Sequence, residues 1–104
     1  MYTEVASKLV VSGTVFSQAV SMAGANGALF EYTIFTTPAG TLTITLEESN
    51  DLENWATHTA DSARSAIGYF SKKVTSIAGA YVRLKYVSSS GDVIVAAGIN
   101  TANL

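Results

Sequence analysis

Side chains that could act as nucleophiles are abundant in this sequence, but side chains that could activate them are scarce. The chain has 24 serine and threonine hydroxyls, one histidine (His58) and no cysteine. A hydroxyl nucleophile needs a base within hydrogen-bond reach, usually His or Lys, and the sequence contains neither a Gly-X-Ser-X-Gly turn nor a Ser-X-X-Lys motif. His58 alternates with Ala56 and Ala60, so we expect it to lie partly exposed on a strand edge. The sequence therefore predicts a protein that is not an enzyme.

Metal and phosphate sites need ligand sets that this chain supplies poorly. Zinc takes three or four Cys, His or carboxylate ligands, and one histidine cannot complete such a set. Calcium takes oxygen ligands, and acids crowd Glu47–Glu53, but without the spacing of an EF-hand loop. Glycine-rich phosphate-binding motifs are absent. We predict no catalytic residue, no cofactor and no metal, and interpret Glu47–Glu53 as a solvated acidic turn, with an ion site as the alternative.

The composition argues against charged partners and against a membrane. Only 13% of the residues are charged, about half the usual 25%, and the formal net charge of −2 gives no basic face for nucleic acid. The longest apolar runs, such as Val93–Ala97, are far shorter than the roughly 20 residues of a membrane helix. No basic segment followed by an apolar run marks a secretory signal near the first residue, so we expect synthesis and folding in a cytoplasm.

Polar and apolar residues alternate along much of the chain, and this period of two is typical of strands. Thr41–Glu47 and Tyr81–Tyr86 are each apolar on one face and polar on the other, as in an antiparallel sheet with one wet face. Leu29–Thr36 and Asp92–Ile99 are apolar on both faces, which predicts burial on two sides or an interface. Weaker strands are expected at four further segments: Glu4–Val11, Thr14–Met22, Trp55–Thr59 and Ile67–Ile77.

Turn signals cut the chain into pieces of about 6 to 11 residues, as expected for a sandwich or barrel. The best helical candidate is a single turn at Asp61–Ile67. We predict an all-β fold, namely a single antiparallel β-sandwich, jelly-roll-like, of about eight strands. Residues 1–104 would form one domain, with flexible ends at 1–7 and 100–104 that could reach a neighbouring subunit.

Charged and apolar residues are distributed as in a protein that packs against a partner. Five acids and no base lie between Glu47 and Asp61, and five bases and no acid lie between Arg64 and Lys85. These blocks could pair within one subunit, or between copies, where charge complementarity fixes the register. In each of the adjacent pairs Leu29-Phe30 and Tyr69-Phe70, the two side chains cannot both face inward on a regular strand. Apolar side chains that face outward suggest a contact surface. The predicted interface residues are Leu29, Phe35, Tyr69, Arg83 and Lys85.

The most specific local motif is the segment from Leu46 to Trp55. We expect Ser49-Asn50-Asp51 to turn the chain with side-chain oxygens on backbone amides, because Asn and Asp tolerate left-handed backbone geometry. Trp55 would then open the next strand and plug the end of the core, with its indole N–H on a carbonyl.

This turn and the later strand at Tyr81-Val82-Arg83 together carry a resemblance to known proteins. Discoidin-like jelly rolls have a Ser-Asn-Asp-Gly-X-X-Trp turn and an Ala-Arg-Tyr-Val-Arg strand. Small bacteriophage virion proteins have a Glu-X-Ser-Asn-Asp-X-X-X-Trp turn, a Tyr-Val-Arg strand and a closing glycine-bounded hairpin. Over residues 28–100 this chain resembles the second group more closely, because it is short, lacks the disulfide common in discoidin domains and shows no signal peptide. Leu52 replaces the usual glycine of the turn and Ala80 the arginine before Tyr81, so no discoidin-type ligand-binding residues are inferred.

The resemblance implies a virion structural or assembly protein, for example a capsid decoration protein, a minor capsid protein or a tail component. Its partners would be further copies of itself and other virion proteins, with no nucleic acid and no membrane, and its location the virion after synthesis in the host cytoplasm. The alternative is a carbohydrate-binding or adhesive β-sandwich module, with or without calcium, using Trp55, Tyr69, Tyr81 and the loop Glu48–Asn54. A third interpretation is a non-viral bacterial β-sandwich.

Overall fold

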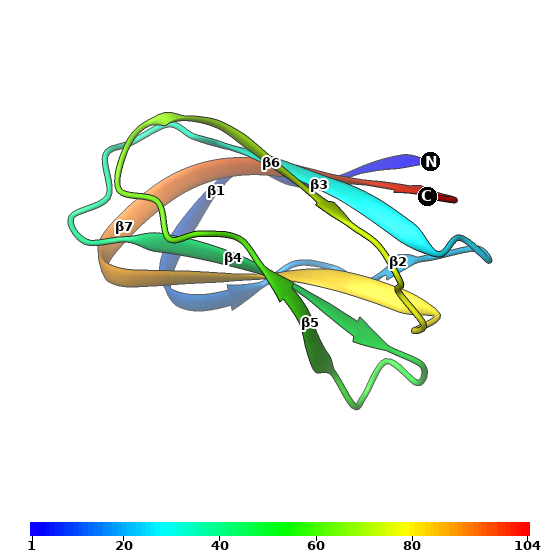
Figure 1. The fold of residues 1–104 in the computed structure, drawn as a ribbon. Coiled ribbons are helices and arrows are strands. Elements are labelled where there is room, and N and C mark those ends of the chain that lie inside the picture. The colour runs from blue at the N-terminus through cyan, green and yellow to red at the C-terminus, as the bar shows by residue number, and fades with distance from the viewer.

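The chain folds into seven antiparallel strands and no helix, as described by a computed structural model of residues 1–104 (Figure 1). The strands are β1 (Tyr2–Phe16), β2 (Val20–Ser21), β3 (Gly27–Ile34), β4 (Leu42–Ser49), β5 (Ala56–Ala60), β6 (Gly68–Val74) and β7 (Tyr81–Ala102). Every pairing between them is antiparallel. The predicted all-β, antiparallel fold class is confirmed.

Strand β7 organises the sheet, because four of the other six strands pair with it. The order is β5-β4-β7-β3-β6, with β1 and β2 also on β7. Residues 81–88 of β7 pair with β4, residues 95–102 pair with β3, and β1 pairs with both halves. The sheet therefore bends over itself into two facing layers, visible in Figure 1. We call them the β3 layer (β6, β3, and the paired parts of β7 and β1) and the β4 layer (β5, β4, the first half of β7, β2 and the end of β1).

The bends in β1 and β7 occur at residues with positive φ. Gly91 in β7 has φ 71° and Gly13 in β1 has φ 67°, a backbone region that glycine enters without steric cost. The Ser88 hydroxyl donates a hydrogen bond to the Gly91 carbonyl across the β7 bend (2.8 Å). In β1, the pairing register with β7 shifts between Ser12 and Thr14, as expected where a bulge turns a strand.

The structure corrects three details of the sequence-based fold. The predicted strands Tyr81–Tyr86 and Asp92–Ile99 are one continuous strand, so seven strands replace about eight. The segment Asp61–Ile67 contains no helical turn, because its backbone bridges Leu42 to Arg64. The ends 1–7 and 100–104, expected to be flexible arms, lie for the most part within strands β1 and β7, where Tyr2 is opposite Asn100.

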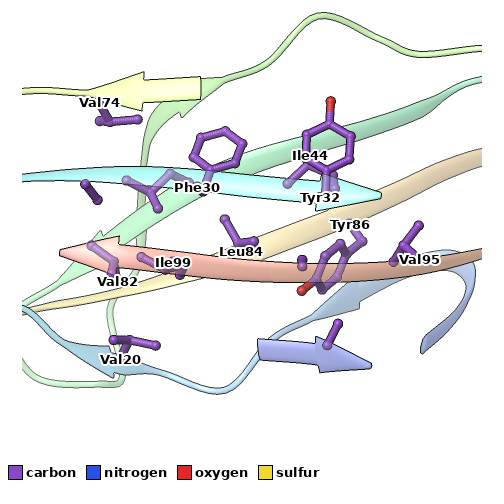
Figure 2. Packing of buried hydrophobic residues seen from close by; sticks show 14 of the residues in the cluster. Val20, Phe30, Tyr32, Ile44, Val74, Val82, Leu84, Tyr86, Val95 and Ile99 are labelled. Carbon is purple, nitrogen blue, oxygen red and sulfur yellow. The ribbon is translucent and has the colours of Figure 1, made fainter. Parts of the chain in front are cut away.

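A core of 20 buried apolar side chains fills the space between the two layers (Figure 2). On β3 the residues alternate from Leu29 onward: Phe30, Tyr32 and Ile34 are buried, whereas Leu29 is exposed and Glu31 and Thr33 are half-buried. From the facing layer, Ile44 and Leu84 are also fully buried. The inward face of each layer therefore packs in the core, and only the outward faces and the loops are accessible to a partner or ligand.

Candidate functional site

The turn at Ser49-Asn50-Asp51 forms as predicted, through side-chain oxygens that accept backbone N–H groups. Ser49 Oγ accepts the amides of Asp51 (3.2 Å) and Leu52 (3.0 Å). Asp51 Oδ1 accepts the amides of Asn54 (2.8 Å) and Glu53 (2.9 Å), and these bonds hold the pKa of the Asp51 carboxyl far below its usual range. The left-handed residue is Leu52 (φ 66°), whereas Asn50 and Asp51 were expected to take that role.

The acidic stretch Glu47–Glu53 is occupied by contacts within the chain. Glu48 Oε1 accepts the amides of Ala78 (3.1 Å) and Gly79 (2.8 Å). Glu47 pairs with Arg83 at 2.8 Å. No group of three or more acidic or histidine side chains is arranged to hold a metal ion. The arrangement positions loops and supplies no ligand cage.

Trp55 does not plug the core, and this corrects the expected role. It is half-buried outside the core cluster, although its indole N–H does reach a carbonyl, that of Leu52 (3.3 Å). The Arg83 guanidinium lies 4.3 Å from the Trp55 ring and 4.1 Å from the Phe16 ring. Arg83 is therefore held between two aromatic rings on the outer side of the β4 layer while it bonds Glu47.

A second ion pair joins Asp61 to Arg64 at 3.1 Å, beside a buried tyrosine. The Tyr32 hydroxyl donates to Asp61, and Arg64 donates to the Tyr32 oxygen (3.3 Å). Burial and the bond to Asp61 raise the pKa of Tyr32 to about 12. Burial alone would raise the pKa of Asp61, but hydrogen bonds from Tyr32, the Ser62 amide and Arg64 outweigh it and lower that pKa. The cluster fixes the loop between β5 and β6.

The acidic and basic blocks thus pair in part within the subunit. Glu47 with Arg83 and Asp61 with Arg64 account for two acids and both arginines. The four lysines of the chain form no ion pair with any carboxylate. His58 lies on the edge strand β5, as predicted, and bonds the Ser76 carbonyl through Nε2 (3.1 Å). It has no hydroxyl nucleophile beyond its neighbour Thr59, which bonds its Nδ1.

The outward side of the β3 layer gathers most of the exposed apolar surface. Six of the ten exposed large apolar or aromatic side chains lie on it or at its rim, and we call this set the apolar outer face: Tyr2, Val10, Leu29, Phe35, Ile67 and Tyr69. The strand register explains the grouping, because laterally paired residues share one face of a sheet. Tyr2 and Leu29 both lie opposite Asn100, and Val10 lies opposite Ile94.

A small hollow of about 70 Å³ lies within the apolar outer face, lined in part by Tyr2, Glu4, Glu31 and Tyr69. The Tyr69 hydroxyl donates to the Glu31 carboxylate, which raises the pKa of Tyr69. The Tyr2 ring lies against Gly98, where an added Cβ would come within 2.1 Å of the Tyr2 oxygen. The hollow is too small for an ordinary ligand pocket of about 300 Å³ or more, so it is better suited to a side chain of a partner.

Three of the five predicted interface residues, Leu29, Phe35 and Tyr69, come together on the apolar outer face. The other two do not, because Arg83 and Lys85 pair with β4 on the opposite layer, and Arg83 is occupied by Glu47. Tyr2 was missed because the first residues were expected to be a flexible arm. Its place depends on pairing with Asn100, which no local pattern reveals.

The residues of the predicted sugar platform are dispersed. Trp55 lies over Arg83, Tyr69 lies on the apolar outer face, and Tyr81 lines a groove formed by loops at one end of the layers. The loop Glu48–Asn54 contributes Asn50 to that same groove. The platform as a unit is therefore not formed, and only Tyr81 and Asn50 share a site.

Comparisons with known proteins identify a fold and no family. No protein-family model matches the sequence, and no curated protein matches it. Among solved structures, the crystal structure of PirA is similar, with a TM-score of 0.64 over 96% of this chain and 92% of that chain, at 11% sequence identity. A likeness at this identity concerns the fold alone. No helix of the chain could cross a membrane.

Proposed function

We propose that this protein is a non-enzymatic structural subunit of a bacteriophage virion that acts by multi-copy protein–protein packing. The observation that carries the proposal is the apolar outer face, on which Tyr2, Leu29 and Tyr69 are exposed on one side of a sheet. A monomer gains nothing from exposing such a surface, whereas a subunit covered by its neighbours does. The resemblance of the Ser49-Asn50-Asp51 turn and the Tyr81-Val82-Arg83 strand to virion proteins supports the viral setting.

The packing is expected to be face to face and not through strand edges. Strand β6 ends the sheet on the β3 side and carries Lys72 and Lys73, and lysines on an edge strand oppose pairing with a further strand. Strand β5 ends the sheet on the other side and has only five residues. Neither of these two edges therefore offers a long, uncharged template for another chain. Strand β1 pairs only with β7 and forms a third edge, but its pairing register shifts at three places, and such bulges oppose pairing with a further strand.

A second copy of this chain is the occupant we propose for the apolar outer face. On the apolar outer face, the carboxylates of Glu4 and Glu31 line the small hollow together with Tyr2 and Tyr69. The four lysines of the chain have no carboxylate partner within the subunit. Charge complementarity between copies could therefore set the register of an apolar contact. Capsid, neck and tail assemblies use such repeated contacts, and symmetric self-association is the usual form of an oligomer.

Light scattering coupled to size-exclusion chromatography tests the packing directly. Leu29→Glu places a charge on the apolar outer face, between Lys73 and Asn100 of the adjacent strands, and should reduce the assembled mass to that of one chain. Thr43→Glu adds the same charge to the outer side of the β4 layer and should leave the mass unchanged. If the oligomer persists in Leu29→Glu but is lost in Thr43→Glu, the interface lies on the β4 layer and the proposal is wrong.

The viral setting has a separate test in the genome. Genes for a capsid, portal or tail beside the gene for this protein would support it. A neighbourhood of secreted enzymes or surface adhesins would count against it, whatever the oligomeric state.

A further inference from the structure

A second hollow, larger than the first and distinct from the apolar outer face, lies at the end of the layers where three loops meet. It has a volume of about 510 Å³, within the 300–1,000 Å³ typical of ligand pockets. Its walls come from the segment 21–26 at the end of β2 and after it, from residues 77–81 before and at the start of β7, and from Asn50 in the acidic turn. We call it the loop-end groove.

Backbone hydrogen bonds between the loops hold the groove in shape. The Ile77 amide donates to the Asn26 carbonyl and the Met22 amide donates to the Ala80 carbonyl, both at 2.8 Å. Ala23 (φ 50°) and Ser76 (φ 59°), on the two opposing loops, have left-handed backbones. Such conformations cost free energy for non-glycine residues and persist only where the surroundings fix them. The groove is therefore already formed without a ligand.

Two asparagine amides in the groove keep a free donor in a fixed orientation. Asn26 Oδ1 accepts the Leu104 amide at 2.8 Å, and Asn50 Oδ1 accepts the Ala80 amide at 3.1 Å. Because the carbonyl oxygen of each side chain is occupied, its NH₂ group points elsewhere, and neither Nδ2 bonds a protein atom. The Tyr81 hydroxyl, also part of the lining, has no protein partner either.

The remaining lining is uncharged and partly apolar. None of the lining residues is Asp, Glu, Lys, Arg or His, and Met22 and Ile77, both buried, form part of the wall. The groove has no charged side chain that would favour an anion or a metal ion, and both asparagine oxygens already accept backbone amides. Neutral molecules with many hydroxyl groups instead combine hydrogen-bond acceptors with apolar C–H faces, which match amide donors and an aromatic ring.

We propose that the loop-end groove is a binding site for a neutral carbohydrate, with Asn26, Asn50 and Tyr81 as its polar contacts. This function goes beyond packing and uses residues that the apolar outer face does not contain. The sugar hydroxyls accept hydrogen bonds from the two amide NH₂ groups, and the Tyr81 ring offers a flat surface for a sugar C–H face. The site can therefore act in an assembled particle as well as in a single subunit.

The test begins with a microarray of neutral glycans, followed by titration of the ¹⁵N-labelled full chain with the strongest binder and with glucose, galactose and N-acetylglucosamine. The expected result is a saturable shift of amide signals in residues 21–26 and 77–81. If no neutral glycan binds, or if the shifts fall on Tyr2, Leu29 and Tyr69, the proposal is wrong.

Two variants and one control assign the site to its residues. Asn50→Asp keeps the Oδ1 acceptor for the Ala80 amide but replaces the NH₂ donor, and we expect binding about tenfold weaker or more. Tyr81→Ala removes the ring and should weaken binding by a similar factor. Thr43→Ala, on the outer side of the β4 layer and outside both the groove and the apolar outer face, should bind as the original protein does. The ¹⁵N spectrum of each variant reports whether it is folded, and undiminished binding by both folded groove variants would overturn the proposal.

Discussion

Two buried tyrosines in the core give opposite predictions for the same substitution. Tyr86 is fully buried and its hydroxyl has no hydrogen-bond partner, and burial raises its pKa strongly. Tyr32 is buried as deeply, but its hydroxyl bonds Asp61 and Arg64. We therefore expect Tyr86→Phe to stabilise the protein and Tyr32→Phe to destabilise it.

The expected magnitudes follow from what each hydroxyl contributes. A buried polar group without a partner costs about 1–3 kcal/mol. Removing the Tyr86 oxygen leaves a void of roughly 15 Å³, which at about 24 cal/mol per Å³ costs about 0.4 kcal/mol. Tyr86→Phe should thus raise the free energy of unfolding by about 1–2 kcal/mol. Tyr32→Phe removes a hydrogen bond to a charged group and should lower it by about 1.5–3 kcal/mol.

Urea unfolding of the original protein and both variants, at one fixed protein concentration, measures these differences. Thermal melting should agree, since about 1 kcal/mol moves the midpoint by about 4–8 °C in a domain of this size. The reasoning would be refuted if Tyr86→Phe were destabilised by 1 kcal/mol or more, because the hydroxyl would then have a partner in solution.

Three further substitutions test other parts of the structure. Leu52→Gly removes the strain of a leucine with a left-handed backbone, although glycine also increases the entropy of the unfolded chain. The free energy of unfolding measured in urea should rise by about 0.5–1 kcal/mol. A lower free energy of unfolding would contradict this prediction. The folded pKa of Asp61 lies below its unfolded value, so its contribution is present above about pH 4 and is lost as the pH falls through the folded pKa. The stability gap between the original protein and Asp61→Asn should therefore narrow between pH 6 and pH 2, and a constant gap would contradict the assignment. Arg83→Lys should shift the emission of Trp55, the single tryptophan, to longer wavelength and cost about 1 kcal/mol, because lysine cannot stack as the planar guanidinium does; unchanged emission would exclude the stack.

The alternation of apolar and polar residues predicts strands well, because every second side chain of a strand faces the buried side of the sheet. Phe30, Tyr32 and Ile34 illustrate this, and so does the separation of exposed Tyr69 from half-buried Phe70. The continuity of β7 was not predictable in the same way. The segment Ser88–Gly91 has the composition of a turn, yet it bends one strand from one layer to the other.

The apolar outer face and the contacts of Trp55 depend on segments that are far apart in the sequence. No local sequence pattern predicts which of these segments meet. Trp55 was expected in the core because it is large and apolar, but the guanidinium of Arg83, from β7 on the far side of β4, lies over its ring. Tyr2 and Leu29 meet the same residue of β7 only because both ends of the chain join the β3 layer. The exposure of Leu29, Phe35 and Tyr69 was predictable, because each is an apolar or aromatic residue at an outward position of an apolar segment.

The central claim is that a second copy of the chain covers the apolar outer face, and thiol reactivity tests it most directly. The chain has no cysteine, so Leu29→Cys and Thr43→Cys each introduce a single thiol, one on either layer. Alkylation rates are measured across a dilution series. The account predicts that the thiol at position 29 reacts slowly in concentrated protein and faster on dilution, while the thiol at position 43 reacts at one rate throughout. Rates at position 29 that do not change with concentration, in a protein with the mass of a single chain, would contradict it.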